Sequence, residues 1–175
     1  MRTKHNGKKA MNRCAPILFL SGIFLLNSCS QKIPENRILT GNDIKHNQNT
    51  NEPVTGIVES FYSTGQLRNR TTYKNGKKEG LDEGFHTNGQ LSYRWNYKDG
   101  KPDGLEKTFD EDGRLRFKEN YTDGKLDGLR ELFFKNGQLK YRWNYKDGKE
   151  DGLWEFFNED GQLLTTWTYK DGVRQ

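Results

Sequence analysis

The chain has 175 residues, with 29 basic and 24 acidic side chains and a formal net charge of +5. This length allows one ordinary domain or one repeat array. Hydrophobic residues make up only 31%, too few for a thick core, and the 19 glycines argue against a bundle of long helices. Residues 1–28 hold five cations and no acid, so the rest is balanced at 24 basic and 24 acidic residues. A basic footprint for nucleic acid is therefore absent from the part expected to fold.

Residues 1–28 have the pattern of a secretion signal. An apolar run over residues 15–26 follows the cationic stretch and is short for a membrane-spanning helix. The run ends in Leu-Asn-Ser-Cys at residues 26–29, which resembles the lipobox of bacterial lipoproteins. The resemblance implies cleavage before Cys29 and lipidation of that residue, with Ser30 favouring the outer membrane. An ordinary signal peptide with a chance cysteine is the alternative, and either Met1 or Met11 serves as the start.

Residues 29–55 lie between the expected anchor and the repeats described below. They are rich in Asn, Gln, Lys and Glu, and their few large apolar residues show no sustained period. This composition predicts a flexible tether. Cys14 and Cys29 are the two cysteines of the sequence. Cleavage removes the first and lipidation blocks the second, so no disulfide is expected.

Residues 56–175 consist of five units of 24 residues without insertions. The units begin at Gly56, Gly80, Gly104, Gly128 and Gly152. Counted from these glycines, positions 1, 10 and 21 are always Gly, position 6 is always Phe, position 12 always Leu and position 18 always Tyr. Such self-similarity at a fixed period is the signature of a repeat architecture.

Each unit predicts two β-strands. Positions 11–19 alternate strictly, with Tyr141 and Trp143 on one side of the strand and Lys140 and Arg142 on the other. Positions 2–8 form the partner strand, and Gly at positions 10 and 21 follows Asn, Asp or Thr, as in tight turns. The sequence therefore predicts an all-β fold, a single-layer antiparallel β-meander of five hairpin repeats with a solenoid-like character.

The repeat resembles a known family. The matching segments are Asn88–Leu91 (NGQL), Asn96–Lys101 (NYKDGK) and Leu126–Leu129 (LDGL), with their equivalents in the other units. They resemble the MORN-repeat variant, a short glycine- and aromatic-rich β-hairpin repeat that also builds proteins labelled YwqK-family antitoxins. The resemblance implies the repeat fold and binding of another protein. It supplies no catalytic residue.

The third unit carries an exchange of charges. We expect even positions of both strands to share one face, which requires a three-residue loop at positions 8–10 or 9–11. Position 4 is Lys107 where the other units have Glu, and position 16 is Glu119 where a ring is usual. This arrangement predicts a cross-strand ion pair between Lys107 and Glu119. Two independent substitutions are the alternative.

The sequence offers little for catalysis or metal binding. His46 falls in the tether, and His86 beside a turn is expected to be solvated, so no enzyme and no cofactor are expected. Acidic pairs such as Asp99 and Asp103 bracket Gly-Lys turns, which raises calcium binding as an alternative. A lysine lies between the acids and the spacing is not that of an EF-hand, so ordinary turn chemistry is favoured and no metal is expected.

The aromatic stripe is the candidate binding surface, since large apolar patches usually mark partners. Its residues are Trp95, Tyr97, Tyr121, Trp143, Tyr145, Trp167 and Tyr169. The alternative is that these rings are the thin core of a one-layer array. Together the features predict a lipid-anchored envelope protein that binds a protein partner, with an antitoxin-like or immunity-like role and a toxin as one such partner. A carbohydrate-binding module and a structural envelope spacer are the alternatives.

Overall fold

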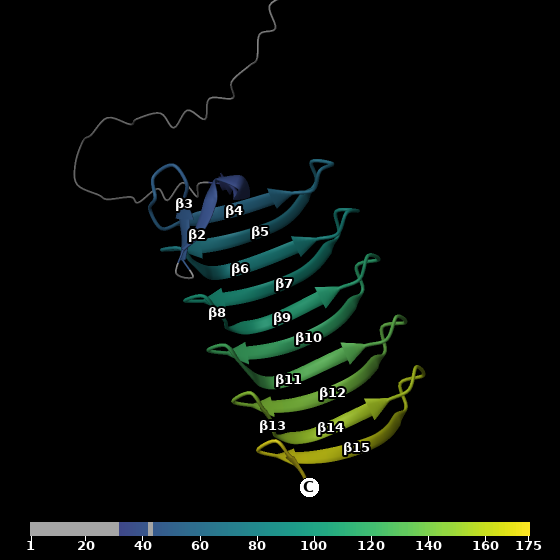
Figure 1. The fold of residues 1–175 in the computed structure, drawn as a ribbon. Helices are drawn as coiled ribbons and strands as arrows, with labels where there is room; N and C mark the ends of the chain where they lie inside the picture. The colour runs from purple at the N-terminus through teal and green to yellow at the C-terminus, as the bar shows by residue number, and fades with distance from the viewer. Residues whose placement is uncertain (1–31, 42–43) are drawn as a thin grey trace, which may run out of the picture.

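The computed structural model describes residues 32–41 and 44–175, and its five repeats form one open sheet in which the repeat strands follow one another in chain order (Figure 1). Each unit is one antiparallel hairpin. The hairpins are β4 (Gly56–Phe61) with β5 (Leu67–Lys74), β6 (Lys77–Phe85) with β7 (Leu91–Lys98), β9 (Gly104–Phe109) with β10 (Leu115–Thr122), β11 (Lys125–Phe133) with β12 (Leu139–Lys146), and β14 (Gly152–Phe157) with β15 (Leu163–Lys170). The predicted all-β, single-layer meander of five repeats is confirmed. The described residues include no helix of the length and apolarity needed to cross a membrane.

Short strands complete the sheet. They are β8 (Lys101–Pro102), β13 (Lys149–Glu150) and β16 (Val173–Arg174), which pair with β7, β12 and β15 respectively. At the turns between units, both central residues have positive φ, as with Asp147 at 49° and Gly148 at 84°. This is the conformation that Asn-Gly and Asp-Gly favour in two-residue hairpin turns. The turn glycines also join neighbouring units, since the Gly148 amide donates to the Leu126 carbonyl at 2.8 Å.

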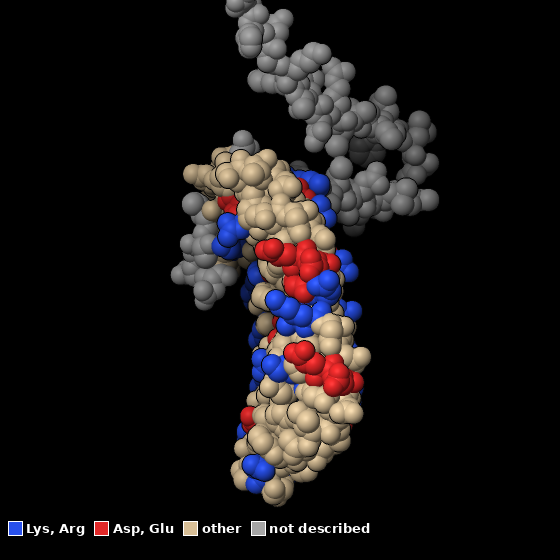
Figure 2. Space-filling view, turned by 90° about the vertical axis from the view of Figure 1, so that its right-hand side faces the viewer, with Lys and Arg blue, Asp and Glu red and all other residues tan. Residues whose placement is uncertain are grey.

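The loops within units have three residues at positions 8–10, one of the two predicted choices. In the first unit the Tyr62 amide donates to the Gln66 carbonyl at 2.8 Å, and Gly65 has φ of 86°. A hydrogen bond also connects the loop ends of neighbouring units, because the Tyr62 hydroxyl donates to the Phe85 carbonyl at 2.7 Å. Figure 2 faces this loop edge, where acidic clusters mark the third loop (Glu111, Asp112) and the fifth loop (Glu159, Asp160).

A β-bulge after each loop changes which residues share a face. Phe61 pairs with Leu67, but Ser60 pairs with Asn69, so Arg68 is an extra residue in β5. The same shift occurs in all five hairpins. Beyond the bulge, odd positions of the first strand oppose even positions of the second. The prediction that even positions share one face in both strands is therefore wrong, except at the Phe–Leu pair next to the loop.

The face opposite the rings carries a ladder of ion pairs between positions 4 and 15. Glu131, which is buried, accepts from Lys118 at 2.8 Å and from Arg142 at 3.2 Å. Lys107 interrupts this ladder, because its register partners are Arg94 and Lys118. Glu119 lies on the other face. The predicted Lys107–Glu119 ion pair is therefore wrong, because the bulge places the two residues on opposite sides of the sheet.

The described part of the expected tether is structured. It contains β1 (Lys32–Pro34), a 3₁₀ turn η1 (Glu35–Arg37) and a hairpin of β2 (Ile38–Gly41) and β3 (Ile44–Asn47). β1 pairs in parallel with β4 and so covers the edge of the first unit. The segment differs from the predicted flexible spacer because its apolar residues Ile33, Ile38 and Val54 pack against the first unit of the array. Cys29 and the expected signal segment lie outside the described residues.

The buried hydrophobic core of the described residues is small and lies at this N-terminal end. It consists of Ile33, Val54, Val58 and Tyr73, with Ile38 packed against it. Val54 is 1% exposed. The β2–β3 hairpin is fixed to the sheet by the Lys45 amide, which donates to the Gly76 carbonyl at 2.9 Å. Residues 32–41 and 44–54 therefore form a cap on the first unit.

Candidate binding face

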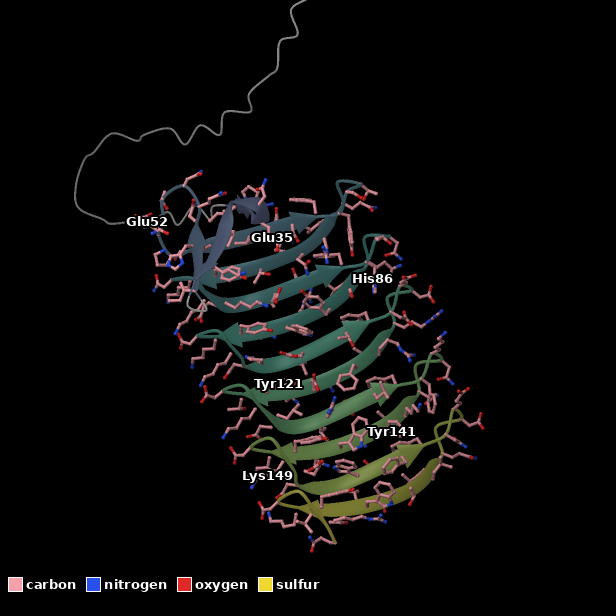
Figure 3. All side chains as sticks on the ribbon, viewed as in Figure 1. Glu35, Glu52, His86, Tyr121, Tyr141 and Lys149 are labelled. Atoms are coloured by element: carbon pink, nitrogen blue, oxygen red, sulfur yellow. The ribbon has the colours of Figure 1, made fainter. Side chains whose placement is uncertain are left out.

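The ring-bearing side of the sheet, called the aromatic face below, is built from positions 3 and 5 of the first strand and positions 14, 16 and 18 of the second. The pairing of Trp154 with Trp167 and of Phe156 with Thr165 shows this arrangement in the fifth unit. Tyr121 lies towards the inter-unit turns and Tyr141 towards the loops (Figure 3). The face thus extends along the strands from the inter-unit turns to the loops.

The rings of the fourth and fifth units form one contiguous cluster. Its members are Tyr141, Trp143, Tyr145, Trp154, Phe156, Trp167 and Tyr169, and the contact of Tyr141 with Phe156 joins the two halves. Trp154 is central, with ring centroids 4.3 Å from Tyr169 and 5.9 Å from Trp143. Each of these rings is only partly buried. Ring-on-ring packing therefore stabilises the sheet and still leaves aromatic surface on the face.

The second unit carries a smaller group of rings. Tyr93 and Trp95 stack with centroids 4.3 Å apart, and Lys78 lies 4.5 Å from the centroid of Tyr97. Burial, followed by the charges of Asp82 and Glu106, raises the pKa of Tyr97 to about 12. This phenol therefore stays neutral at physiological pH, and its hydroxyl retains its proton.

The third unit separates the two ring groups with charged residues. Glu106 on β9 is directly opposite Glu119 on β10, and Glu119 is in turn opposite Arg130 on β11. Nε of Arg130 lies 3.2 Å from Oε2 of Glu119. Burial is the main cause that raises the pKa of Glu106, to about 7, and the neighbouring charges of Glu119 and Asp82 add to it.

The first unit shows this face covered by the chain's own cap. Ile38 and Lys45 from the cap line a pocket together with Val58, Thr71 and Tyr73 from the sheet. The aromatic face therefore holds a polypeptide segment at one end. Among the described residues, the cap covers the first unit and leaves the rings of the fourth and fifth units without a comparable cover.

The structure brings all of the predicted surface residues onto this face but divides them into two groups. Trp95 and Tyr97 belong to the second unit and four others lie in the ring cluster, whereas Tyr121 lies between these groups in the charged third unit. Sequence reasoning missed Trp154 and Phe156, which stand at positions 3 and 5, and left Tyr141 out of the predicted surface although the alternation placed it on the side of Trp143. The β-bulge places Trp154 and Phe156 on the aromatic face, and no residue type in the sequence marks the position of the bulge.

The other candidate sites have structural roles. A ring nitrogen of His86 lies 3.0 Å from the Phe109 carbonyl, so this histidine joins two loops and is not simply solvated (Figure 3). The turn carboxylates bind lysines and backbone amides, as Asp123 accepts from Lys101 at 2.7 Å. In the part of the chain that the structure describes, no three His, Cys, Asp or Glu residues form a group that could hold a metal ion.

The comparisons with known proteins decide the family. The MORN repeat variant matches residues 54–75, 78–99, 102–123, 126–147 and 150–171. The chain belongs to the MORN repeat variant family. No curated protein matches the sequence significantly. Among solved structures, a mutant of S. aureus TarM is similar over 66% of this chain and 21% of its own, with 14% identity and a TM-score of 0.35. The repeat family thus agrees with the resemblance found in the sequence.

Proposed function

We propose that this protein is anchored in the bacterial envelope by a lipid at Cys29 and binds a protein partner through its aromatic face. The observation that carries the proposal is the half-buried cluster of seven rings in the fourth and fifth units. Exposed aromatic patches of this kind favour protein docking. The cap on the first unit supports the same idea, because it shows the face packing against polypeptide.

The repeat family and the aromatic side chains of the face favour a protein as the partner. An antitoxin-like or immunity-like role, in which the array sequesters a toxin, fits a rigid sheet with one aromatic side. Carbohydrate binding would favour asparagines beside the rings in an open groove. Asparagines at position 17 instead bond the backbone of the neighbouring strand, as Asn144 donates to the Leu153 carbonyl at 2.7 Å. We therefore favour a protein partner over a polysaccharide.

Photo-crosslinking from two adjacent positions of β15 tests the binding face. Thr165 and Thr166 are both exposed, but Thr165 lies on the aromatic face and Thr166 on the ion-pair face. A photoreactive phenylalanine analogue at position 165 should form a protein adduct in whole cells, and the same analogue at position 166 should not. Adducts of equal yield from both positions, or from position 166 alone, would contradict the proposal.

The anchor has its own test. Cys29→Ala should abolish labelling by radioactive palmitate and leave precursor or soluble protein, because the acylated thiol is lost. Membrane attachment of this variant at the level of the unaltered chain would show that Cys29 is not the anchor. The outer membrane is the expected site, which sucrose-gradient fractionation of membranes checks.

A further inference from the structure

One buried carboxylate of the described residues lacks a counter-ion. The buried carboxylates are Glu59, Asp82, Glu83, Glu106 and Glu131, between 2% and 8% exposed. Four of them accept a hydrogen bond from a lysine or arginine. Glu106, at 6% exposure, has no hydrogen bond or ion pair with any described residue, and its Oε1 is buried without a partner. Leaving such a group unpaired is unfavourable, so its environment is incomplete without a cation or a proton.

The aromatic face already contains two arrangements in which a carboxylate, a cation and a ring lie together. Lys78 binds Asp82 and lies 4.5 Å from the centroid of Tyr97. Arg130 lies 3.2 Å from Glu119 and its guanidinium carbon is 4.8 Å from the centroid of Phe117. Cations over aromatic rings beside a carboxylate are favourable in both cases.

Glu106 lies between these two arrangements and has a ring beside it. β7 and β9 pair at Arg94 and Lys107, so Trp95 and Glu106, the adjacent residue of each strand, are neighbours on the aromatic face, and Glu119 on β10 is opposite Glu106. The carboxylate and the ring are therefore present, and the cation is missing. Glu119 already pairs with Arg130 and Asp82 with Lys78, so neither of these cations is free for Glu106.

We propose that Glu106 and Trp95 form a binding site for an arginine side chain of a protein partner. A planar guanidinium can stack on the indole of Trp95 and donate to the carboxylate of Glu106, and its flat shape distinguishes it from a lysine ammonium. The proposal rests on the proposed function, because it assumes that this face binds a protein. It makes the third unit the part of the face that selects the partner by charge.

The test is a titration of the full chain with two matched peptides. One is acetyl-Gly-Gly-Arg-Gly-Gly-amide, and the other has citrulline, a neutral isostere, in place of arginine. The indole N–H resonance of Trp95 in ¹H–¹⁵N NMR reports binding. The arginine peptide should shift this resonance, and the citrulline peptide should do so at least tenfold more weakly. Equal shifts, or none with either peptide at tens of millimolar, would overturn the site.

Two variants assign the effect to Glu106. Glu106→Gln should weaken binding of the arginine peptide at least tenfold, since the side chain keeps its size and loses its charge. Glu131→Gln is the matched control, because Glu131 is equally buried but lies on the ion-pair face. Unchanged binding by the Glu106 variant would overturn the proposal. The peptide comparison in the unaltered chain decides the matter even if that variant fails to fold.

The crosslink from position 165 separates this proposal from the proposed function. If the arginine peptide does not bind Trp95 but the adduct from position 165 persists, the arginine site is wrong and the binding face stands. If position 165 of the unaltered chain gives no adduct, the proposed function fails whatever the peptides do.

Discussion

Glu106 makes the stability of the array depend on pH. Its pKa is raised from 4.5 to about 7, first by burial and then by the charges of Glu119 and Asp82, which the charge of Lys78 partly offsets. The folded state therefore holds this proton more tightly than the unfolded chain does. The resulting stabilisation is complete below pH 4.5 and is lost as the pH rises through about 7.

Glu106→Gln should remove this pH dependence, because the amide has no proton to lose. We expect the variant to be more stable than the unaltered chain at pH 8, by about 1–3 kcal/mol, because the amide is as unpaired as the carboxylate but carries no buried charge. Urea unfolding at pH 5 and pH 8 measures the difference. Burial also raises the pKa of Glu119, so some of the slope should remain. A variant with the full slope of the unaltered chain would contradict the assignment to Glu106.

Lys107→Glu should stabilise the array, the reverse of what the sequence predicts for this change. The new carboxylate would lie between Arg94 and Lys118 and restore the alternating ladder of the ion-pair face. Cross-strand pairs of opposite charge contribute about 0.2–1 kcal/mol. Urea unfolding of the single variant measures this gain.

The double variant with Glu119→Lys checks the geometry behind that prediction. Glu119→Lys alone places a lysine opposite Arg130, which is unfavourable, and also opposite Glu106, which is favourable, so its own effect must be measured separately. Since positions 107 and 119 lie on opposite faces, the two changes should add without compensating each other. A double variant clearly more stable than the sum of the two single effects would restore the original ion-pair interpretation.

At the scale of strands, the sequence predicted each hairpin but not how its two strands face each other. Alternation within β12 is visible in its residues, whereas the pairing of β11 with β12 depends on a bulge that no residue type marks. Position 3 illustrates the consequence. It holds Val58, Asp82, Glu106, Arg130 and Trp154, one from each unit. A column without a common residue type gave no sign that it belongs to the aromatic face.

The cap was missed for a related reason. Ile33, Ile38 and Val54 pack individually against the first unit and do not form one regular face of a strand or helix. Their spacing in the sequence therefore shows no period. Local patterns reveal elements that bury one regular face. They do not reveal single apolar residues that dock on a distant strand, so the composition of residues 29–55 suggested a tether.

Val54→Asp should detach this cap without unfolding the array. Val54 is 1% exposed, and a carboxylate there would have no cation in the described core, so the local penalty should be at least about 2 kcal/mol. Amide exchange should accelerate in β1, β2 and β3 and stay slow in β11 and β12. Val173→Asp is the control, because Val173 is 63% exposed and should tolerate the change. Exchange that accelerates equally in every unit would show that the cap is not a separate element.

At the scale of the whole molecule, the array is a linear repeat in which each unit contacts the next. Stability in such arrays is approximately a sum of unit terms and interface terms. The interface terms are unequal here. The ring cluster joins the fourth and fifth units, whereas charged pairs such as Glu119 with Arg130 join the third and fourth. The buried hydrophobic core lies at the opposite end, beneath the cap.

Trp154→Ala should therefore cost more than Trp95→Ala, although both remove an indole from the same face. Trp154 contacts the rings of Trp143, Tyr145 and Tyr169, and its loss should destabilise the C-terminal units by about 3–5 kcal/mol. Trp95 stacks on Tyr93 alone among the described rings, so its replacement should cost less. Hydrogen exchange measured strand by strand tests the comparison. Protection should fall in β12, β14 and β15 for Trp154→Ala and stay unchanged in β4 and β5, because loss in one interface is felt by its neighbours first. An equal loss of protection along the whole sheet would mean that the array unfolds as one cooperative unit, and the aromatic cluster would then act as part of a continuous core.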